Sequence, residues 1–183
     1  MRFTAITQVH LPCRFQHVIA GETYRDGRQY LPTLWFTPHT ESQTTIPMAS
    51  LAIVDRHHVV DTQLVGQHGD VQLVLLLSPF MLQKAPHQRG FCDVGSPARV
   101  PQVYGQVTHV ATWEVPQTPL PYQSLYCEFV MDVGGGTVGV RTHVSAPNLA
   151  DRIGTAQLKP GDWVVVPRPR IDVLGFVPHR DTK

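Results

Sequence analysis

Valine, interrupted by turn-forming residues, is the feature that most constrains this sequence. The 183 residues include 24 valines, and 16 prolines and 14 glycines break the chain every few positions. A branched Val side chain favours extended backbone, whereas Pro and Gly end strands and form turns. The pattern predicts short strands of roughly five to eight residues with little helix between them. We therefore expect an all-β (mainly β) protein.

The first half of the chain is expected to form six strands. Turns are predicted at 25–28, where the sequence reads Arg-Asp-Gly-Arg, and at 37–47 and 67–70. The predicted strands are 2–10, 13–20, 30–36, 49–54, 57–66 and 70–77.

A segment rich in Pro, Gly and short polar residues follows these strands. Residues 84–101 read KAPHQRGFCDVGSPARVP, a composition typical of a linker or a long connection. We therefore place a boundary near residue 97, with a β-rich N-terminal domain of unknown type at 1–97 and a second domain at 98–183.

The second part has a clearer order of elements. A Gly134-Gly135-Gly136 turn separates two strands. A short helix is predicted because Ser145 or Asn148 can cap its start and Pro147 lies near its first turn. The elements are strands at 103–113, 124–133, 137–144, 162–167 and 170–177, with the helix at 148–157 before the fourth strand.

Three strands, a helix and two more strands are the order of an OB-fold, the small Greek-key barrel. Three segments carry the likeness: V-Y-G-Q-V-T at 103–108, G-V-R-T-H-V at 139–144 and L-K-P-G-D-W-V-V-V at 158–166. In these segments, residues 103–177 resemble the OB-fold domains of single-stranded nucleic-acid-binding proteins. The resemblance implies a five-stranded OB-like barrel with one short helix over 98–183, and an oligonucleotide as its ligand.

A short internal echo links the two halves. Residues 69–74 (GDVQLV) and 161–166 (GDWVVV) begin alike. One interpretation is a second, degenerate barrel in the N-terminal half. The interpretation we favour is that any strand after a turn has this composition.

Period-two alternation assigns faces to the second and third strands of the predicted barrel. Val138, Val140 and Val144 are assigned inward from the third strand. The inward set of the second strand is Leu125, Cys127, Phe129, Met131 and Val133.

The opposite face of these two strands carries the predicted binding residues. Tyr126, Arg141 and His143 are expected on an open sheet face, where OB-folds bind oligonucleotides. An ordinary solvated sheet face is the competing interpretation.

Two proline-stiffened loops flank that face. Trp113 and Tyr122 accompany the loop 114–123, and Arg168 and Arg170 belong to the turn Pro-Arg-Pro-Arg. Aromatic rings stack on bases and guanidinium groups contact phosphates, so all four are candidate nucleic-acid-binding residues. The two tryptophans Trp113 and Trp163 equally suit barrel packing.

Charge argues against strong, indiscriminate binding to polyanions. Lys and Arg total 15 against 14 Asp and Glu, a formal net charge of +1. Such binding grows with the number of phosphates neutralised, so near-neutrality leaves room for modest binding, and for the nucleic-acid hypothesis we expect affinity of roughly micromolar or tighter. The basic residues are 12 Arg and only 3 Lys, which favours planar, bidentate contacts.

Enzyme and metal signatures are missing from the sequence. It has no G-x-S-x-G, Walker A, H-E-x-x-H or dinucleotide-binding pattern, so we expect a non-catalytic protein without a cofactor. Asp55, His57 and Asp61 share a face of a predicted strand but lack the spacing of known metal sites, and no metal is expected. The other histidines show no regular spacing and are interpreted as surface residues.

The expected compartment is the cytoplasm. The first residues lack the apolar core of a secretory signal, and no run of about 20 apolar residues predicts a membrane span. Three widely spaced cysteines, Cys13, Cys92 and Cys127, suit reduced thiols in small apolar sites.

Two functions are carried forward from the sequence. The first is binding of single-stranded DNA or RNA by stacking and arginine contacts, without membrane association. The alternative is a protein–protein interaction or assembly module that uses neutral, Pro- and Gln-rich surfaces to bind a protein partner or to form a homo-oligomer.

Overall fold

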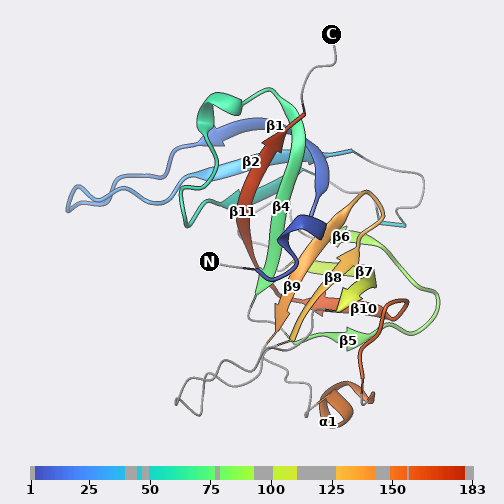
Figure 1. Cartoon of the computed structure of the whole chain (residues 1–183). Coiled ribbons are helices and arrows are strands. Elements are labelled where there is room, and N and C mark those ends of the chain that lie inside the picture. Colours follow the sequence, from blue (N-terminus) through green and yellow to red (C-terminus); the bar gives the residue numbers. More distant parts are fainter. Residues whose placement is uncertain are drawn as a thin grey trace.

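The fold is all-β, as expected, and is dominated by one extensive sheet (Figure 1). The computed structural model describes residues 3–39, 45–46, 50–76, 79–92, 101–110, 127–142, 149–155 and 157–179. Its strands are β1 (Leu11–Ile19), β2 (Thr33–Pro38), β3 (Leu51–Val54), β4 (His68–Leu76), β5 (Met81–Leu82), β6 (Gly90–Cys92), β7 (Gln102–Val110), β8 (Cys127–Asp132), β9 (Thr137–Thr142), β10 (Trp163–Pro167) and β11 (Arg170–Pro178). The helical elements are the 3-10 turns η1 (Ile6–Gln8) and η2 (Thr62–Leu64) and the helix α1 (Leu149–Ile153).

Two predicted strands are wrong, those at 2–10 and 57–66. The first region contains η1, and the second contains a loop followed by η2. In the second region the Asp55 carboxylate accepts hydrogen bonds from the backbone N–H groups of His57 and Val59, and the Asp61 side chain caps η2. Such local side-chain contacts satisfy the backbone and compete with strand pairing.

The strand β4 connects the two halves of the sheet. The strand order is β3-β2-β1-β4-β9-β8-β7-β10-β5, with β11 also paired to β4 and β6 to β7. Along one edge, β4 pairs antiparallel with β1 near its start and parallel with β9 over Val74–Leu76. Its other edge pairs with β11 from Gly69 to Leu76. Because β4 precedes the boundary expected near residue 97 and both β9 and β11 follow it, every backbone hydrogen bond between them joins the two expected domains.

The two halves repeat one plan, and in each half a strand after the repeat pairs with the other half. The series β1-β2-β3 is followed by β4, which pairs with β1, and the series β7-β8-β9 is followed by β10, which pairs with β7. The next strand in each half then pairs in the other half: β5 pairs with β10, and β11 pairs with β4. The echo between 69–74 and 161–166 thus lies at equivalent places, in or just before β4 and β10.

The five-stranded barrel is not confirmed, because the sheet is open. Its expected last strand, β11, pairs with β4 and not with another strand of the second half. The Gly134–Gly136 hairpin does join β8 and β9 as predicted. The predicted inward residues that the structure describes, Cys127, Phe129, Met131, Val133, Val138 and Val140, are all buried in the main core.

A second, smaller core lies on the opposite face of the sheet. Phe3, Ala5 and Val9 from the N-terminal segment cover Val74, Leu76 and Val130. Gly139 makes this close approach possible, since a Cβ atom there would lie 2.7 Å from the Phe3 ring. The N-terminal segment therefore packs across β4, β8 and β9.

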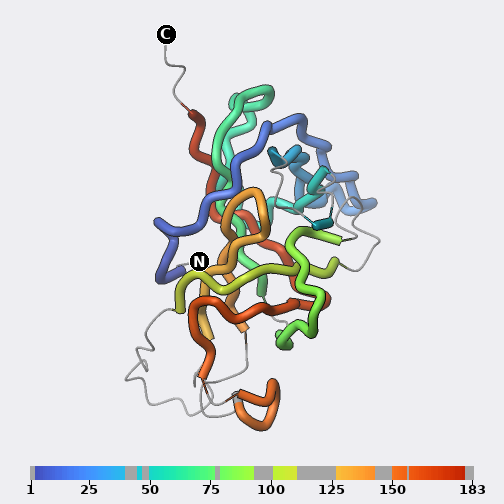
Figure 2. Tube along the Cα trace, turned by 90° about the vertical axis from the view of Figure 1, so that its right-hand side faces the viewer, coloured from blue at the N-terminus to red at the C-terminus, as the bar shows by residue number. Residues whose placement is uncertain are grey.

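A hairpin arm, residues 20–32, projects from β1 and β2 (Figure 1). The rings of Tyr24 and Tyr30 stack on it with centroids 3.7 Å apart, and both side chains are nearly half exposed. The views in Figures 1 and 2 place α1 at one end of the molecule and the last residues of β11 at the other. In the described part of the chain, no helix has the length and apolar character needed to cross a bilayer.

Candidate nucleic-acid interface

Two of the predicted arginines meet in one row across the sheet. Arg170 of β11 lies opposite Leu76 of β4, and Leu76 lies opposite Arg141 of β9. Residues opposite one another in paired strands project from the same face, so both guanidinium groups arise beside the buried Leu76. Their backbones are two strand spacings apart, roughly 10 Å.

Arg141 is held by a buried carboxylate. Its Nε donates to Glu128 Oε1 at 2.6 Å, and its Nη2 contacts the same oxygen. Glu128 Oε2 also accepts a hydrogen bond from the backbone N–H of Thr4 at 3.0 Å. Glu128 is 4% exposed, whereas the Arg141 side chain retains 21% exposure. The acid therefore fixes the arginine and is itself withdrawn from solvent.

Arg170 has the same arrangement with a second buried acid. Its Nη2 lies 3.0 Å from Asp172 Oδ2, and Asp172 has no solvent exposure. The loop after β3 brings two further groups to this carboxylate: Arg56 Nε lies 3.7 Å from Oδ1, and His57 Nε2 lies 3.5 Å from Oδ2. Each of these three basic side chains remains more than a third exposed.

Arg168 completes what we call the arginine cluster: Arg56, Arg141, Arg168 and Arg170. Arg168 is exposed, and its backbone takes a left-handed φ of 52° while its N–H donates to Pro101 O. Arg56 and Arg170 pair with buried Asp172 and Arg141 pairs with buried Glu128, while Arg168 lies two residues before Arg170 in the chain. These described side chains comprise four cations and two anions, a formal charge of +2. A chain of net charge +1 thus gathers local positive charge at one place.

The prediction of an open sheet face is wrong for the residues that the structure describes. On the face that carries Arg141, Val130 is buried with Leu76, and Glu128 is nearly so. The N-terminal segment covers this surface because Gly139 leaves room for Phe3. Trp113, Tyr122, Tyr126 and His143 lie outside the described residues, so their assignment to the interface stays a prediction.

The residues weighed as a metal site have separate structural roles. Asp55 caps its own loop, Asp61 caps η2, and His57 reaches Asp172. No group of three or more His, Cys, Asp or Glu side chains suited to a metal ion occurs within the described ranges.

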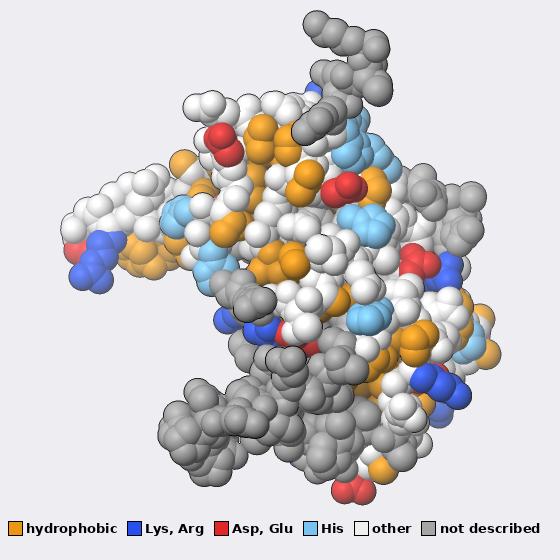
Figure 3. All heavy atoms as spheres, viewed as in Figure 1, with side chains coloured by type: hydrophobic (Ala, Val, Ile, Leu, Met, Phe, Trp, Pro, Cys, Tyr) orange, Lys and Arg blue, Asp and Glu red, His pale blue; other side chains and the backbone are white. Residues whose placement is uncertain are grey.

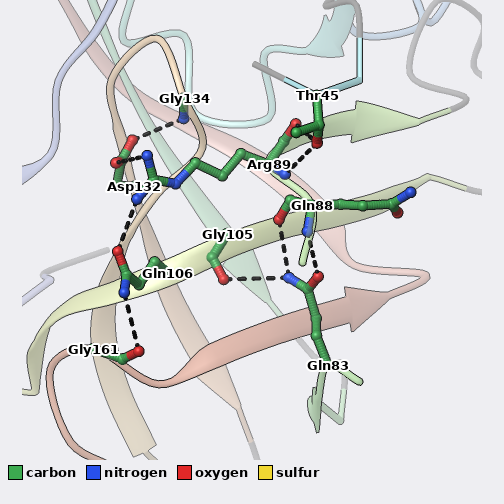
Figure 4. A network of polar contacts seen from close by, with 9 residues as sticks. All are labelled: Thr45, Gln83, Gln88, Arg89, Gly105, Gln106, Asp132, Gly134 and Gly161. Atoms are coloured by element: carbon green, nitrogen blue, oxygen red, sulfur yellow. Dashed lines mark hydrogen bonds and ion pairs between the residues drawn. The ribbon is translucent and has the colours of Figure 1, made fainter. Parts of the chain in front are cut away.

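Another arginine, Arg89, ties the sheet together. Its Nη2 donates to Gln106 Oε1 at 2.7 Å, and its Nη1 lies 3.3 Å from Asp132 (Figure 4). Its guanidinium carbon lies 4.8 Å from the centre of the Trp163 ring, on which His87 also stacks. His87 and Arg89 thus cover part of the Trp163 ring, and the residue is half-buried.

Sequence reasoning missed Arg56, Glu128 and Asp172. Glu128 and Asp172 are acids with apolar residues on both sides in their strands, at positions that the fold buries. A buried acid requires a basic partner, which is the signal that points toward Arg141 and Arg170. Arg56 follows a strand that is remote in sequence, and only the fold brings it to Asp172.

Comparisons with protein-family models, with curated proteins and with solved structures find no match for this chain.

We predict strong energetic coupling between Arg141 and Glu128. Arg141→Met leaves a buried carboxylate without its counter-ion and should lower the free energy of unfolding by about 3–5 kcal/mol. Adding Glu128→Gln removes that buried charge, so the double variant should recover most of the loss. Urea unfolding of both single variants and the double variant measures the coupling. If the losses in the two single variants simply added in the double variant, the ion pair between Arg141 and Glu128 would be contradicted.

Two of the three thiols should be inert in the folded protein. Burial raises the pKa of both Cys13 and Cys127 from 9.0 to about 12, and both side chains are almost fully buried. Since the thiolate is the reactive form, iodoacetamide at pH 8 should label Cys92 alone in native protein and all three after unfolding. Rapid labelling of Cys13 or Cys127 in the native protein would contradict this expectation.

The same raised pKa values predict a pH dependence of stability. Because these two thiols lose their protons near pH 9 in the unfolded chain, the free energy of unfolding should fall above that pH.

Proposed function

We propose that the protein binds single-stranded nucleic acid, DNA or RNA, through the arginine cluster. The observation that carries the proposal is that buried Glu128 and Asp172 orient arginines whose guanidinium groups keep exposed surface. Guanidinium groups fixed in this way suit phosphate oxygens, because their paired N–H donors match the geometry of the anion.

The charge balance sets the expected strength of binding. A formal +2 at the cluster supports a few phosphate contacts, so affinity should be modest and should depend on salt. Base stacking on Tyr126, the residue immediately before β8, would add sequence-tolerant affinity and belongs to the same proposal.

The test is fluorescence anisotropy of labelled oligo-dT and its RNA counterpart at several salt concentrations. Arg56→Gln and Arg168→Gln should each weaken binding, and each should reduce the slope of log K against log salt by about one. Within the part of the chain that the structure describes, the exposed Arg168 side chain forms no ion pair with a buried acid, so its variant tests charge with little structural cost.

Arg25→Gln is the matched control. Arg25 is exposed on the hairpin arm, so the variant loses the same charge away from the cluster. It should bind like the parent protein, and melting temperatures should show that all variants are folded. Equal affinity in the parent and in the cluster variants, or no binding at low salt, would overturn the proposal.

The hairpin arm favours the second candidate, a protein-interaction module. Tyr24, Tyr30 and Leu31 on the arm and Ile19 at the adjoining end of β1 are each at least 40% exposed, and aromatic side chains are enriched at protein interfaces. Figure 3 shows the arm standing clear of the rest of the molecule. A stable oligomer in light scattering, together with no oligonucleotide binding, would favour this candidate.

A further inference from the structure

Two exposed tyrosines form a pair on the hairpin arm. The rings of Tyr24 and Tyr30 stack with centroids 3.7 Å apart and planes inclined by 23°, and the two residues are 45% and 49% exposed. Figure 3 shows apolar side chains on the surface of this arm. The pair lies outside both hydrophobic cores and outside the arginine cluster.

The backbone of the hairpin places these two side chains next to each other. Tyr24 N–H donates to Arg28 O at 2.6 Å, and Tyr30 N–H donates to Glu22 O at 2.8 Å. Tyr24 and Tyr30 are therefore diagonal neighbours on one face of the hairpin, within reach of aromatic side chains. The stack is thus a consequence of the folded hairpin.

A hydrogen bond between the two side chains fixes the direction of the stack. The hydrogen bond that Tyr24 makes with Tyr30 stabilises its protonated phenol and so raises its pKa. The hydroxyl is the single polar group of a tyrosine side chain, so both hydroxyls lie at the same end of the stack. The Cε carbons flank the carbon that carries the hydroxyl. Those of one ring therefore face those of the other.

We propose that Tyr24 and Tyr30 are a site of oxidative modification, at which a one-electron oxidant joins the two rings within one chain as dityrosine. The unpaired electron of a phenoxyl radical resides partly on the Cε carbons, in orbitals perpendicular to the ring. Face-to-face stacking directs these orbitals toward each other. The exposure of both rings gives the oxidant access to them.

The step balances with the removal of two electrons. Each phenol loses one electron and its hydroxyl proton, and the two radicals form a carbon–carbon bond between a Cε of Tyr24 and a Cε of Tyr30. The hydrogens on these two carbons then leave as protons while the two oxygens each take up a proton, which restores both aromatic rings. The oxidant accepts the two electrons, and two protons pass to water. The protein therefore loses two hydrogen atoms.

The product closes the arm covalently. A bond between the side chains of residues 24 and 30 spans the turn and prevents the rings from separating, so it fixes the exposed aromatic surface of the arm. The modification involves no residue of the arginine cluster, so the proposal is independent of nucleic-acid binding.

The test is photo-oxidation of the full-length protein with ruthenium(II) tris-bipyridine, light and persulfate, in which each persulfate accepts two electrons and becomes two sulfates. The product is then unfolded and digested with trypsin, which cleaves after arginine and separates Tyr24 and Tyr30 into the peptides 15–25 and 29–56. Mass spectrometry should find these peptides joined, two hydrogen atoms lighter than their sum. Dityrosine fluorescence should increase in parallel.

Variants of exposed and partly exposed tyrosines provide the controls. Tyr24→Phe and Tyr30→Phe each remove one phenol and should abolish the joined product. Tyr104→Phe is the matched control, because Tyr104 of β7 donates its hydroxyl to Gln102 Oε1 at 2.6 Å and lies in another strand. It should leave the yield of the joined peptides unchanged.

Dilution and unfolding separate this proposal from its competitors. A bond within one chain should form in the same yield after tenfold dilution of the protein. Loss of the joined peptides on dilution, or cross-linked dimers in their place, would overturn the proposal. An equal yield from protein unfolded in urea would also overturn it, because closeness in sequence would then explain the bond without the stacked hairpin.

Discussion

The rest of the structure depends on the strand pairing of β4. From Leu73 to Leu76 this strand is buried on both faces, with Leu73 and Leu75 in the main core and Val74 and Leu76 in the smaller one. A continuous apolar run is what a strand covered on both sides requires. Its two edges bind β1, β9 and β11, so three strand pairings depend on β4.

The same pairing creates the candidate interface. Arg141 and Arg170 belong to segments of the chain that meet only because β9 and β11 lie on opposite edges of β4. The N-terminal segment adds the Thr4 N–H that bonds Glu128, and the loop after β3 adds Arg56. Local positive charge on an almost neutral protein is therefore a product of tertiary structure.

The sequence predicted what depends on local pattern. Alternation identified the inward residues of β8, such as Phe129 and Met131. The three consecutive glycines identified the turn between β8 and β9. It could not identify strand partners, because alternation records which face is buried and not which edge is paired. The pairing of β5 with β10, the pairing of β11 with β4 and the packing of Phe3 over the sheet could therefore not be predicted from alternation.

For the candidate sites the division is similar. Arg141 was predicted from strand alternation, and Arg168 and Arg170 from the resemblance to OB-fold domains. The structure places Arg141 and Arg170 in one row. Arg56 and Asp172 are far apart in sequence, and only the fold brings them together.

Native-state hydrogen exchange of the backbone amides tests whether β4 makes the two halves one cooperative unit. We expect the slowest amides of β1, β4, β8 and β11 to exchange with a single free energy of opening, equal to that of global unfolding. Two separate values, one for strands before residue 97 and another for strands after it, would contradict the claim.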